Sequence, residues 1–237
     1  KFYGLENYGD PDAVITPEGI NINVDFKGSL RDYQKPVVEK WLKAAKKKGC
    51  GLIEADCGAG KTCMAIWLIS QLKKKTLIIV HKEFLLNQWK ERLEQFMPDA
   101  KIGRIQGPII DIEGKDVVIG MLQSLSMKDY DLDAFNTFDF VLIDECHHIS
   151  SRVFSKALQK LSCKYHIGLS ATPQRSDRLM KVLEWHIGGI IFKVSNNDDV
   201  KLKRTVKIQR ICLNSNNATF YYEILNYKQK PNVVSMI

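Results

Sequence analysis

The sequence predicts an α/β domain with a mostly parallel sheet and helices on both of its faces. Short β-branched segments alternate along the chain with longer segments of helical periodicity, which is the order that a doubly wound sheet produces. Runs such as Leu77–Val80 and Phe140–Ile143 contain no alternating polar residues, as expected of strands buried on both faces. A ligand of such a domain binds at the carboxyl ends of the strands.

The expected elements follow one another from residue 51 onward. The strands are rich in Val, Ile and Thr, which favour strands, and are Gly51–Ala55, Thr76–Val80, Val117–Gly120, Phe138–Asp144, His166–Ser170 and Ile190–Val194. The helices have apolar residues three and four positions apart, and are Lys61–Lys73, Glu83–Gln95, Arg152–Leu161 and Ser176–Trp185.

Composition divides the chain into three parts. Residues 1–28 form a lead-in with Gly, Pro and Asp, within which Ile20–Phe26 alternates as a strand does. Residues 29–195 carry the alternating strands and helices. Residues 196–237 form a basic connection that begins in the Asn- and Asp-rich segment Ser195–Asp199, which has the composition of a surface loop.

Length and charge exclude some classes of protein. The chain has 237 residues, of which 45% are apolar, enough for a hydrophobic core and too many for a disordered chain or a disulfide-stapled miniprotein. Its 35 Lys+Arg and 27 Asp+Glu give a net charge of +8. Most of that excess lies after residue 199, so net charge alone does not make the body of the chain a nucleic-acid surface.

Cysteine spacing and hydropathy point to a reducing compartment. The six cysteines, at positions 50, 57, 63, 146, 163 and 212, form no Cys-x-x-Cys pair, so we expect free thiols and neither a zinc site nor a redox motif. No apolar stretch approaches the roughly 20 residues of a membrane span, and no signal-peptide pattern is present. We expect an intracellular protein, nuclear, cytoplasmic or at a virus replication site, that is not secreted and has no membrane partner.

A glycine-rich loop is the most specific motif. Residues Ala55–Thr62 read ADCGAGKT and lie between an expected strand and an expected helix. Gly58 and Gly60 can adopt backbone angles closed to other residues, so that consecutive N–H groups surround phosphate oxygens at the positive end of the helix. Lys61 supplies a positive charge to the outer phosphates, and the Thr62 hydroxyl can ligate Mg²⁺. Ala55 stands where a P-loop usually has its first glycine.

An acidic pair supplies the second half of such a site. Asp144 and Glu145 directly follow the apolar run Phe140–Ile143, so both lie at the carboxyl edge of the sheet, as the phosphate loop does. Asp144 is expected to hold Mg²⁺, and Glu145 to orient or deprotonate the attacking water. An acidic pair in this place can also cap a helix, and the phosphate loop upstream favours the catalytic interpretation.

Together these motifs resemble those of the superfamily 2 nucleic-acid helicases. Ala55–Thr62 is similar to motif I of that family, and Asp144-Glu145-Cys146-His147 to its DExH box. Leu30–Gln34 resembles the Q-type motif, and Ser170-Ala171-Thr172 resembles motif III. The resemblance covers Gly28–Val194, and it implies a RecA-like P-loop NTPase domain.

The resemblance also implies roles for individual residues. The nucleotide-binding residues would be Arg31, Gln34, Cys57, Gly58, Ala59, Gly60, Lys61 and Thr62; the catalytic residues would be Lys61, Asp144 and Glu145; the Mg²⁺ ligands would be Thr62 and Asp144. Gln34 would read the adenine edge. His147, Ser170 and Thr172 would couple the nucleotide state to domain closure, and His81, Lys82, Gln123, Ser124 and the helix with Gln88 and Trp89 would face nucleic acid. His81 stands where the family usually has proline.

Within the superfamily, the chain is most similar to the XPB-like DNA helicases and their relatives in large DNA viruses and phages. The expected function is that of an ATP-dependent helicase, with Mg²⁺ as the metal and DNA preferred to RNA. The resemblance implies a second RecA-like domain of the same protein that supplies an arginine finger. The chain alone is therefore expected to be monomeric and weak or inactive in ATP hydrolysis.

Several alternatives stay open on the sequence alone. The motor could move along duplex DNA without unwinding it, or the phosphate loop could gate nucleic-acid binding without turnover. Cys57, Cys63 and Cys146 lie close to the nucleotide motifs and could form a redox switch, although small buried thiols are the simpler interpretation. The lysine runs Lys46–Lys48 and Lys73–Lys75 are expected to be solvated last turns of helices.

Overall fold

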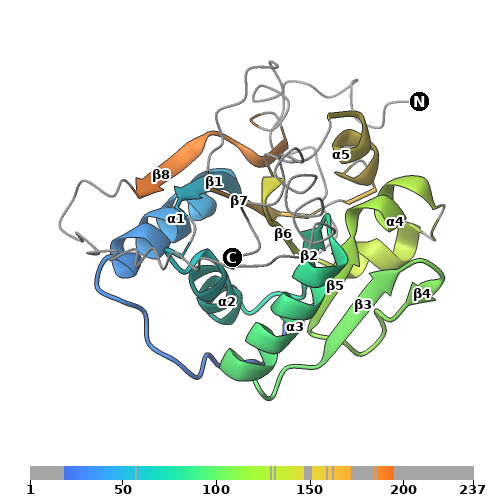
Figure 1. Ribbon diagram of the computed structural model, residues 1–237, viewed down its shortest axis with the longest axis horizontal. Coiled ribbons are helices and arrows are strands. Elements are labelled where there is room, and N and C mark those ends of the chain that lie inside the picture. The colour runs from blue at the N-terminus through green and yellow to red at the C-terminus, as the bar shows by residue number, and fades with distance from the viewer. Residues whose placement is uncertain are drawn as a thin grey trace, which may run out of the picture. The chain divides into compact units, whose positions relative to one another are not determined.

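A mostly parallel sheet lies at the centre of the computed structural model, as the sequence predicts (Figure 1). The structure describes residues 19–194 except 57, 129, 131, 147–150, 159, 162, 172–183 and 185. Within these residues the sheet has eight strands in the order β4-β3-β5-β2-β6-β7-β1-β8. Every neighbouring pair is parallel except β3 and β4, which are antiparallel. The α/β fold class is confirmed.

The six strands expected from residue 51 onward are all present, with bounds that differ by at most a few residues. The strands are β1 Cys50–Ala55, β2 Thr76–Val80, β3 Ile102–Gln106, β4 Ile109–Ile110, β5 Val117–Met121, β6 Phe140–Ile143, β7 Tyr165–Ser170 and β8 Ile190–Val194. The short hairpin of β3 and β4 was not expected. It extends the sheet beyond β5, so that β5 is an inner strand of the sheet.

The described helices are α1 Gln34–Lys48, α2 Lys61–Leu72, α3 Glu83–Phe96, α4 Leu122–Met127 and α5 Ser151–Leu158, with a 3₁₀ turn at Leu132–Thr137. The expected helix Arg152–Leu161 ends earlier, at Leu158. The expected helix Ser176–Trp185 and the basic connection 196–237 lie outside the described residues. Among the described residues, no helix has the length and apolar character that crossing a membrane requires.

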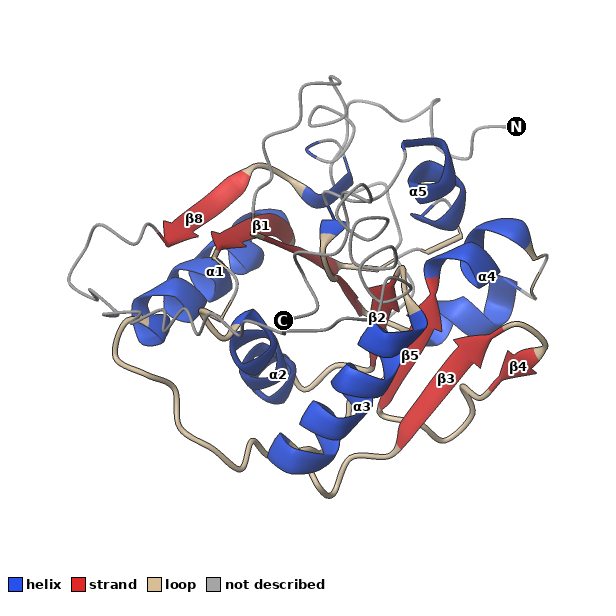
Figure 2. Cartoon of the chain, viewed as in Figure 1, coloured by secondary structure: helices blue, strands red, loops and turns tan. Residues whose placement is uncertain are grey.

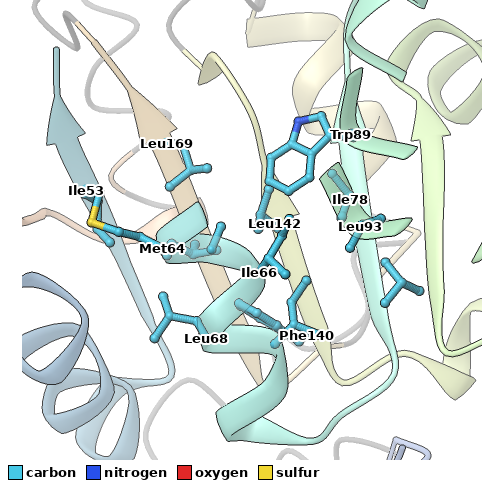
Figure 3. Packing of buried hydrophobic residues seen from close by; sticks show 14 of the residues in the cluster. Ile53, Met64, Ile66, Leu68, Ile78, Trp89, Leu93, Phe140, Leu142 and Leu169 are labelled. Atoms are coloured by element: carbon cyan, nitrogen blue, oxygen red, sulfur yellow. The ribbon is translucent and has the colours of Figure 1, made fainter. Parts of the chain in front are cut away.

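Helices cover both faces of the sheet (Figure 2), and an apolar layer lies between the helices and each face. Helices α1, α2 and α3 pack on one face, where Trp41, Ile66 and Trp89 are buried. Helices α4 and α5 pack on the other face, around Leu125, Phe135 and Leu158. Figure 3 shows side chains of α2 and α3 packed against β2, β6 and β7 in the first layer. Because the helices bury both faces, the central strands read as uninterrupted apolar runs.

The alternating segment Ile20–Phe26 is not a strand, contrary to prediction. Its only described ladder contact is an isolated antiparallel bridge between Asn21 and Lys74. Ile22 and Val24 are nevertheless buried in the first layer, while Asn21, Asn23 and Asp25 are exposed. The period of two therefore reflects burial of an extended segment against the domain, without the neighbouring strand that would make it part of the sheet.

Lys75 is not solvated, contrary to the prediction for the run Lys73–Lys75. It is 3% exposed, its Nζ donates to the carbonyl of Ile112 at 3.0 Å, and its ammonium lies 5.3 Å from the centre of the Phe138 ring. Burial lowers the pKa of Lys75, and the negative charge of Asp116 opposes this shift. Lysine 75 thus belongs to the packing at the amino end of β2.

The buried layer predicts a clear contrast between two phenylalanines. Phe140 is fully buried, and its ring centre lies 5.6 Å from that of Trp41, so Phe140→Ala should lower the free energy of unfolding by about 3–5 kcal/mol. Phe84 is 62% exposed, so Phe84→Ala should change it by no more than about 0.5 kcal/mol. Urea unfolding at equilibrium measures both values, and equal losses would contradict this description of the core.

Candidate nucleotide site

The phosphate loop joins the carboxyl end of β1 to the first turn of α2. Gly58 has φ +83° and Gly60 has φ +76°. Both angles lie in the left-handed region, which residues with a Cβ rarely adopt. A Cβ on Gly60 would collide with the side-chain amide nitrogen of Gln34, whereas one on Gly58 would meet nothing within 4 Å. Gly60 is therefore required by both backbone angle and packing. The predicted strand–loop–helix context of the motif is confirmed.

Lys61 lies at the start of α2 and is 9% exposed. Its Nζ donates to the carbonyl oxygen of Ala55 at 2.9 Å and lies 3.6 Å from Oε1 of Glu145. A buried ammonium needs such partners, because burial without them would be strongly unfavourable. The lysine thus contacts the ends of both β1 and β6.

The acidic pair follows β6 directly, as predicted. Asp144 is 7% exposed; its Oδ2 accepts a hydrogen bond from Nε1 of Trp89 at 2.7 Å, and its Oδ1 accepts one from the backbone N–H of Glu145 at 3.0 Å. Burial raises the pKa of Asp144, and the bond from Trp89 opposes that rise. Glu145 has φ +47°, a backbone conformation that costs a non-glycine residue about 1–3 kcal/mol and is found mostly at functional sites.

A pocket of about 380 Å³ brings the two motifs together. Six predicted site residues line it: Gly58, Gly60, Lys61, Thr62, Asp144 and Glu145. The remaining lining comes from Cys63 and from the α3 residues Leu85, Gln88, Arg92 and Phe96. The parallel order of β1, β7 and β6 accounts for this arrangement, since it aligns their carboxyl ends at one edge.

The side chains of α3 were missed as pocket residues. Gln88 was expected to face nucleic acid, but it lines this pocket, and Trp89 is 1% exposed with its indole on Asp144. The sequence spacing could have predicted the burial of Trp89: Leu85, Trp89 and Leu93 are four residues apart, so they lie on the same buried face of α3. Arg92 lies one turn beyond Gln88 on the same side of the helix.

The Q-type motif contacts the phosphate loop. Gln34 is 2% exposed; its Nε2 donates to the carbonyl of Ala59 at 2.9 Å, and its Oε1 accepts from the backbone N–H of Arg31 at 2.9 Å. The Tyr33 hydroxyl donates to the same Ala59 carbonyl at 3.0 Å, and Arg31 Nη1 donates to that hydroxyl at 3.2 Å. Gln34 therefore braces the loop. It does not line the pocket, and its contact with adenine stays a prediction, for which its amide keeps one N–H and one lone pair.

Mg²⁺ fits the donor set at this site. Thr62 and Asp144 both line the pocket and offer only oxygen donors, which Mg²⁺ prefers. Among the described residues, no group of three or more His, Cys, Asp or Glu side chains could hold a metal alone. Mg²⁺ commonly keeps several water ligands, so Thr62 and Asp144 would need only phosphate and water beside them.

The described thiols argue against a redox switch. Cys63, Cys146 and Cys163 are free, as predicted. Burial raises the pKa of the Cys146 thiol to about 12 and also raises the pKa of Cys63. Because the thiolate is the reactive form, both are poor nucleophiles at neutral pH. Cys57 lies outside the described residues.

Of the predicted coupling residues, Ser170 is described. It is fully buried at the end of β7 and pairs in register with Glu54 of β1, one residue before Ala55. Strand β7 therefore lies beside the strand that leads into the phosphate loop. His147 and Thr172 lie outside the described residues.

The predicted nucleic-acid residues lie together at the carboxyl ends of β2 and β5. Gln123 Nε2 donates to the carbonyl of His81 at 3.1 Å, and Ser124 Oγ accepts from the backbone N–H of Gly107 at 2.9 Å. Lys82 is exposed and lies 5.8 Å from the ring centre of Phe84. These contacts join the loops after β2, β3 and β5 into one surface, which we call the β2–β5 edge.

Comparison with known proteins gives a family match over most of the described chain. Residues 27–175 match the family described as type III restriction enzyme, res subunit. A protein of Acanthamoeba polyphaga mimivirus that is named as an ATP-dependent RNA helicase is 36% identical over 193 residues, which cover 81% of this chain and 37% of the relative. The DNA 3′–5′ translocase XPB2 of Sulfurisphaera tokodaii is 34% identical over 169 residues, 71% of this chain and 36% of the relative. The chain thus spans little more than a third of the length of either relative.

Solved structures share the fold. The UvsW helicase of bacteriophage T4 superposes with a TM-score of 0.60 at 22% identity, covering 74% of this chain and 64% of that chain. The SWI2/SNF2 ATPase core of Sulfolobus solfataricus, solved with double-stranded DNA, gives a TM-score of 0.57 at 22% identity over 71% of this chain and 37% of that chain. The RecA-like fold and the resemblance to XPB-like and viral helicases are confirmed.

The brace on the phosphate loop leads to a stability prediction. Gln34→Ala removes a buried donor from the Ala59 carbonyl, so we expect it to lower the free energy of unfolding by about 1–3 kcal/mol and to weaken nucleotide binding. Tyr33→Phe removes the other donor to that carbonyl but keeps the ring, so its cost should be smaller. Urea unfolding and titration with a fluorescent nucleotide measure both effects. A larger loss for Tyr33→Phe would show that the hydroxyl is the main brace.

Proposed function

Because this chain belongs to the family of the type III restriction enzyme res subunit, we propose that it is the ATP-binding half of an ATP-driven nucleic-acid motor. The observation that carries this proposal is the shared pocket of Lys61, Thr62, Asp144 and Glu145. A phosphate loop and an acidic pair at one sheet edge are what ATP hydrolysis requires, and a module that only sensed nucleotide would not need Glu145.

The proposed chemistry divides among four side chains. The backbone N–H groups of the loop and the Lys61 ammonium bind the phosphates of ATP. Thr62 and Asp144 would hold Mg²⁺, which when bound would neutralise charge at the outer phosphates. Glu145 orients the attacking water and accepts its proton. Its ion pair with Lys61 at 3.6 Å holds the carboxylate at the pocket.

Nucleic acid is proposed to bind along the β2–β5 edge, near His81, Lys82, Gln123 and Ser124. The joined loops and the exposed Lys82 support a phosphate-contacting surface there, and such binding would weaken with rising salt. We propose DNA in preference to RNA, and an intracellular site of action.

A translocase that moves along the duplex without unwinding it is the second candidate, favoured by the 34% identity to a DNA 3′–5′ translocase.

A second RecA-like domain is proposed to complete the motor. Relatives more than twice as long as the matched segment support this proposal. The second domain would supply the arginine finger, and Ser170, Thr172 and His147 would couple its closure to the nucleotide. Domain closure on ATP and opening after hydrolysis would then produce movement.

Substitution of Glu145 tests the proposed chemistry. We expect Glu145→Gln to lower turnover by about 10²–10⁴-fold, because the water loses its base, while ATP binding is retained. Lys61→Ala should instead abolish ATP binding. Turnover is measured in the polypeptide that also carries the second domain, by phosphate release with single-stranded DNA, duplex DNA or RNA, and binding by a fluorescent nucleotide. Glu113→Gln is the control, since Glu113 is exposed in a turn away from the pocket; unchanged turnover in Glu145→Gln would remove the catalytic role of Glu145.

Addition of the second domain tests the division of labour. Without an arginine finger, this chain should hydrolyse ATP about 10³–10⁵-fold more slowly than a polypeptide that also carries the second domain. Steady-state turnover of the two proteins under saturating DNA provides the comparison. Equal rates, stimulated by nucleic acid in both, would contradict the need for a second domain.

A further inference from the structure

We propose that Trp89 is a positioning residue that holds the carboxylate of Asp144 in place for the magnesium–nucleotide complex. The inference rests on the proposed function, because it assigns a role in the same site. Its basis is the hydrogen bond from the indole Nε1 to Oδ2 of Asp144, which is 2.7 Å long and buried. The bond joins α3 to the end of β6 across 55 positions of the chain.

The indole spans the boundary between the core and the pocket. Trp89 is 1% exposed and belongs to the apolar layer formed by α1, α2 and α3. Figure 3 shows its ring beside Leu142, with the nitrogen pointing away from the labelled aliphatic side chains. The ring is therefore fixed by packing, and its single N–H is left to reach the carboxylate. A donor held in this way restricts rotation of the acceptor far more than a flexible side chain would.

The two hydrogen bonds of Asp144 set the orientation of its carboxylate. Oδ2 accepts from Trp89, and Oδ1 accepts from the backbone N–H of Glu145. Each carboxylate oxygen can accept about two hydrogen bonds, so each keeps a lone pair for the metal or for water on the metal. Because both oxygens of Asp144 are held by protein donors, the carboxylate has one preferred orientation, and so do its remaining lone pairs.

A neutral donor suits this position. Trp89 stabilises the carboxylate without a charge, whereas Lys or Arg in its place would compete with Mg²⁺ for the same oxygens. The buried cation of the pocket, Lys61, is directed instead to Ala55 and Glu145. Asp144 thus stays available to a metal while its orientation is fixed, in the way that groups behind metal ligands commonly tune a site.

Trp89→Phe tests the proposal, with Trp41→Phe as the matched control. Phenylalanine keeps an aromatic ring but has no N–H. Trp41 is also fully buried in the same layer, and its Nε1 donates to the backbone carbonyl of Gly51 at 3.2 Å, away from the pocket. Both substitutions should lower stability, but only Trp89→Phe removes a donor from Asp144.

The measurement is binding of fluorescent ADP with and without Mg²⁺. We expect Trp89→Phe to raise the Mg²⁺ concentration needed for half-maximal binding by about 10-fold, with metal-free binding unchanged. Trp41→Phe should leave the Mg²⁺ dependence unaltered. An unchanged Mg²⁺ dependence in folded Trp89→Phe overturns the positioning role. An equal loss of binding with and without Mg²⁺ also overturns it, because that result describes packing alone.

The NMR signal of the Trp89 indole N–H gives a second readout that does not depend on turnover. The chain has four tryptophans, so the signal of Trp89 is assigned by its loss in Trp89→Phe. Mg²⁺ with ADP should shift the Trp89 N–H signal and leave that of Trp41 in place; an unmoved Trp89 signal in the nucleotide-bound protein overturns the inference. If the unsubstituted chain binds no nucleotide at all, the proposed function fails, and this inference fails with it.

Discussion

The buried charge of Lys61 is the constraint on which the nucleotide site depends. An ammonium that is 9% exposed must have partners nearby, and Lys61 finds them in the carbonyl at the end of β1 and the carboxylate that follows β6. Strand β7 lies between these two strands. The lysine therefore connects the two motifs that the sheet order brings to one edge, and a change in register of either strand would leave its charge without compensation.

Helix α3 relates this site to the β2–β5 edge. The helix begins directly after His81 and Lys82, and two turns later Trp89 reaches Asp144. Between these points Leu85 and Leu86 are buried against the sheet, so the segment is held by packing along its length. A displacement of the loop after β2 cannot be absorbed easily within α3, because close-packed cores resist small deformations. The contact between Trp89 and Asp144 is therefore a physical link between the proposed nucleic-acid surface and the proposed Mg²⁺ ligand Asp144.

The sequence predicts best where one chemical requirement dominates. The apolar runs of β2 and β6, and the glycines of the phosphate loop, have few structural alternatives. The hairpin of β3 and β4 was missed because β4 has only two residues and because Gly103, Arg104 and Gln106 interrupt the apolar pattern of β3. The burial of Lys75 and the indole contact of Trp89 depend on residues distant in sequence, so neither local composition nor helical period could specify them. The spacing of apolar residues in α3 predicts that Trp89 is buried, but it does not predict that Asp144 after β6 is its hydrogen-bond partner.

Charge balance in the pocket supports the proposal that it binds a magnesium nucleotide. Its described lining carries two cations, Lys61 and Arg92, and two carboxylates, Asp144 and Glu145. Two uncompensated carboxylates this close would repel phosphate, and two uncompensated cations would compete with Mg²⁺ for it. The buried lysine pairs with Glu145, while Asp144 is satisfied by neutral N–H groups. The pocket therefore holds one carboxylate paired with a cation and one held by neutral donors, and the second is the one a metal ion can neutralise.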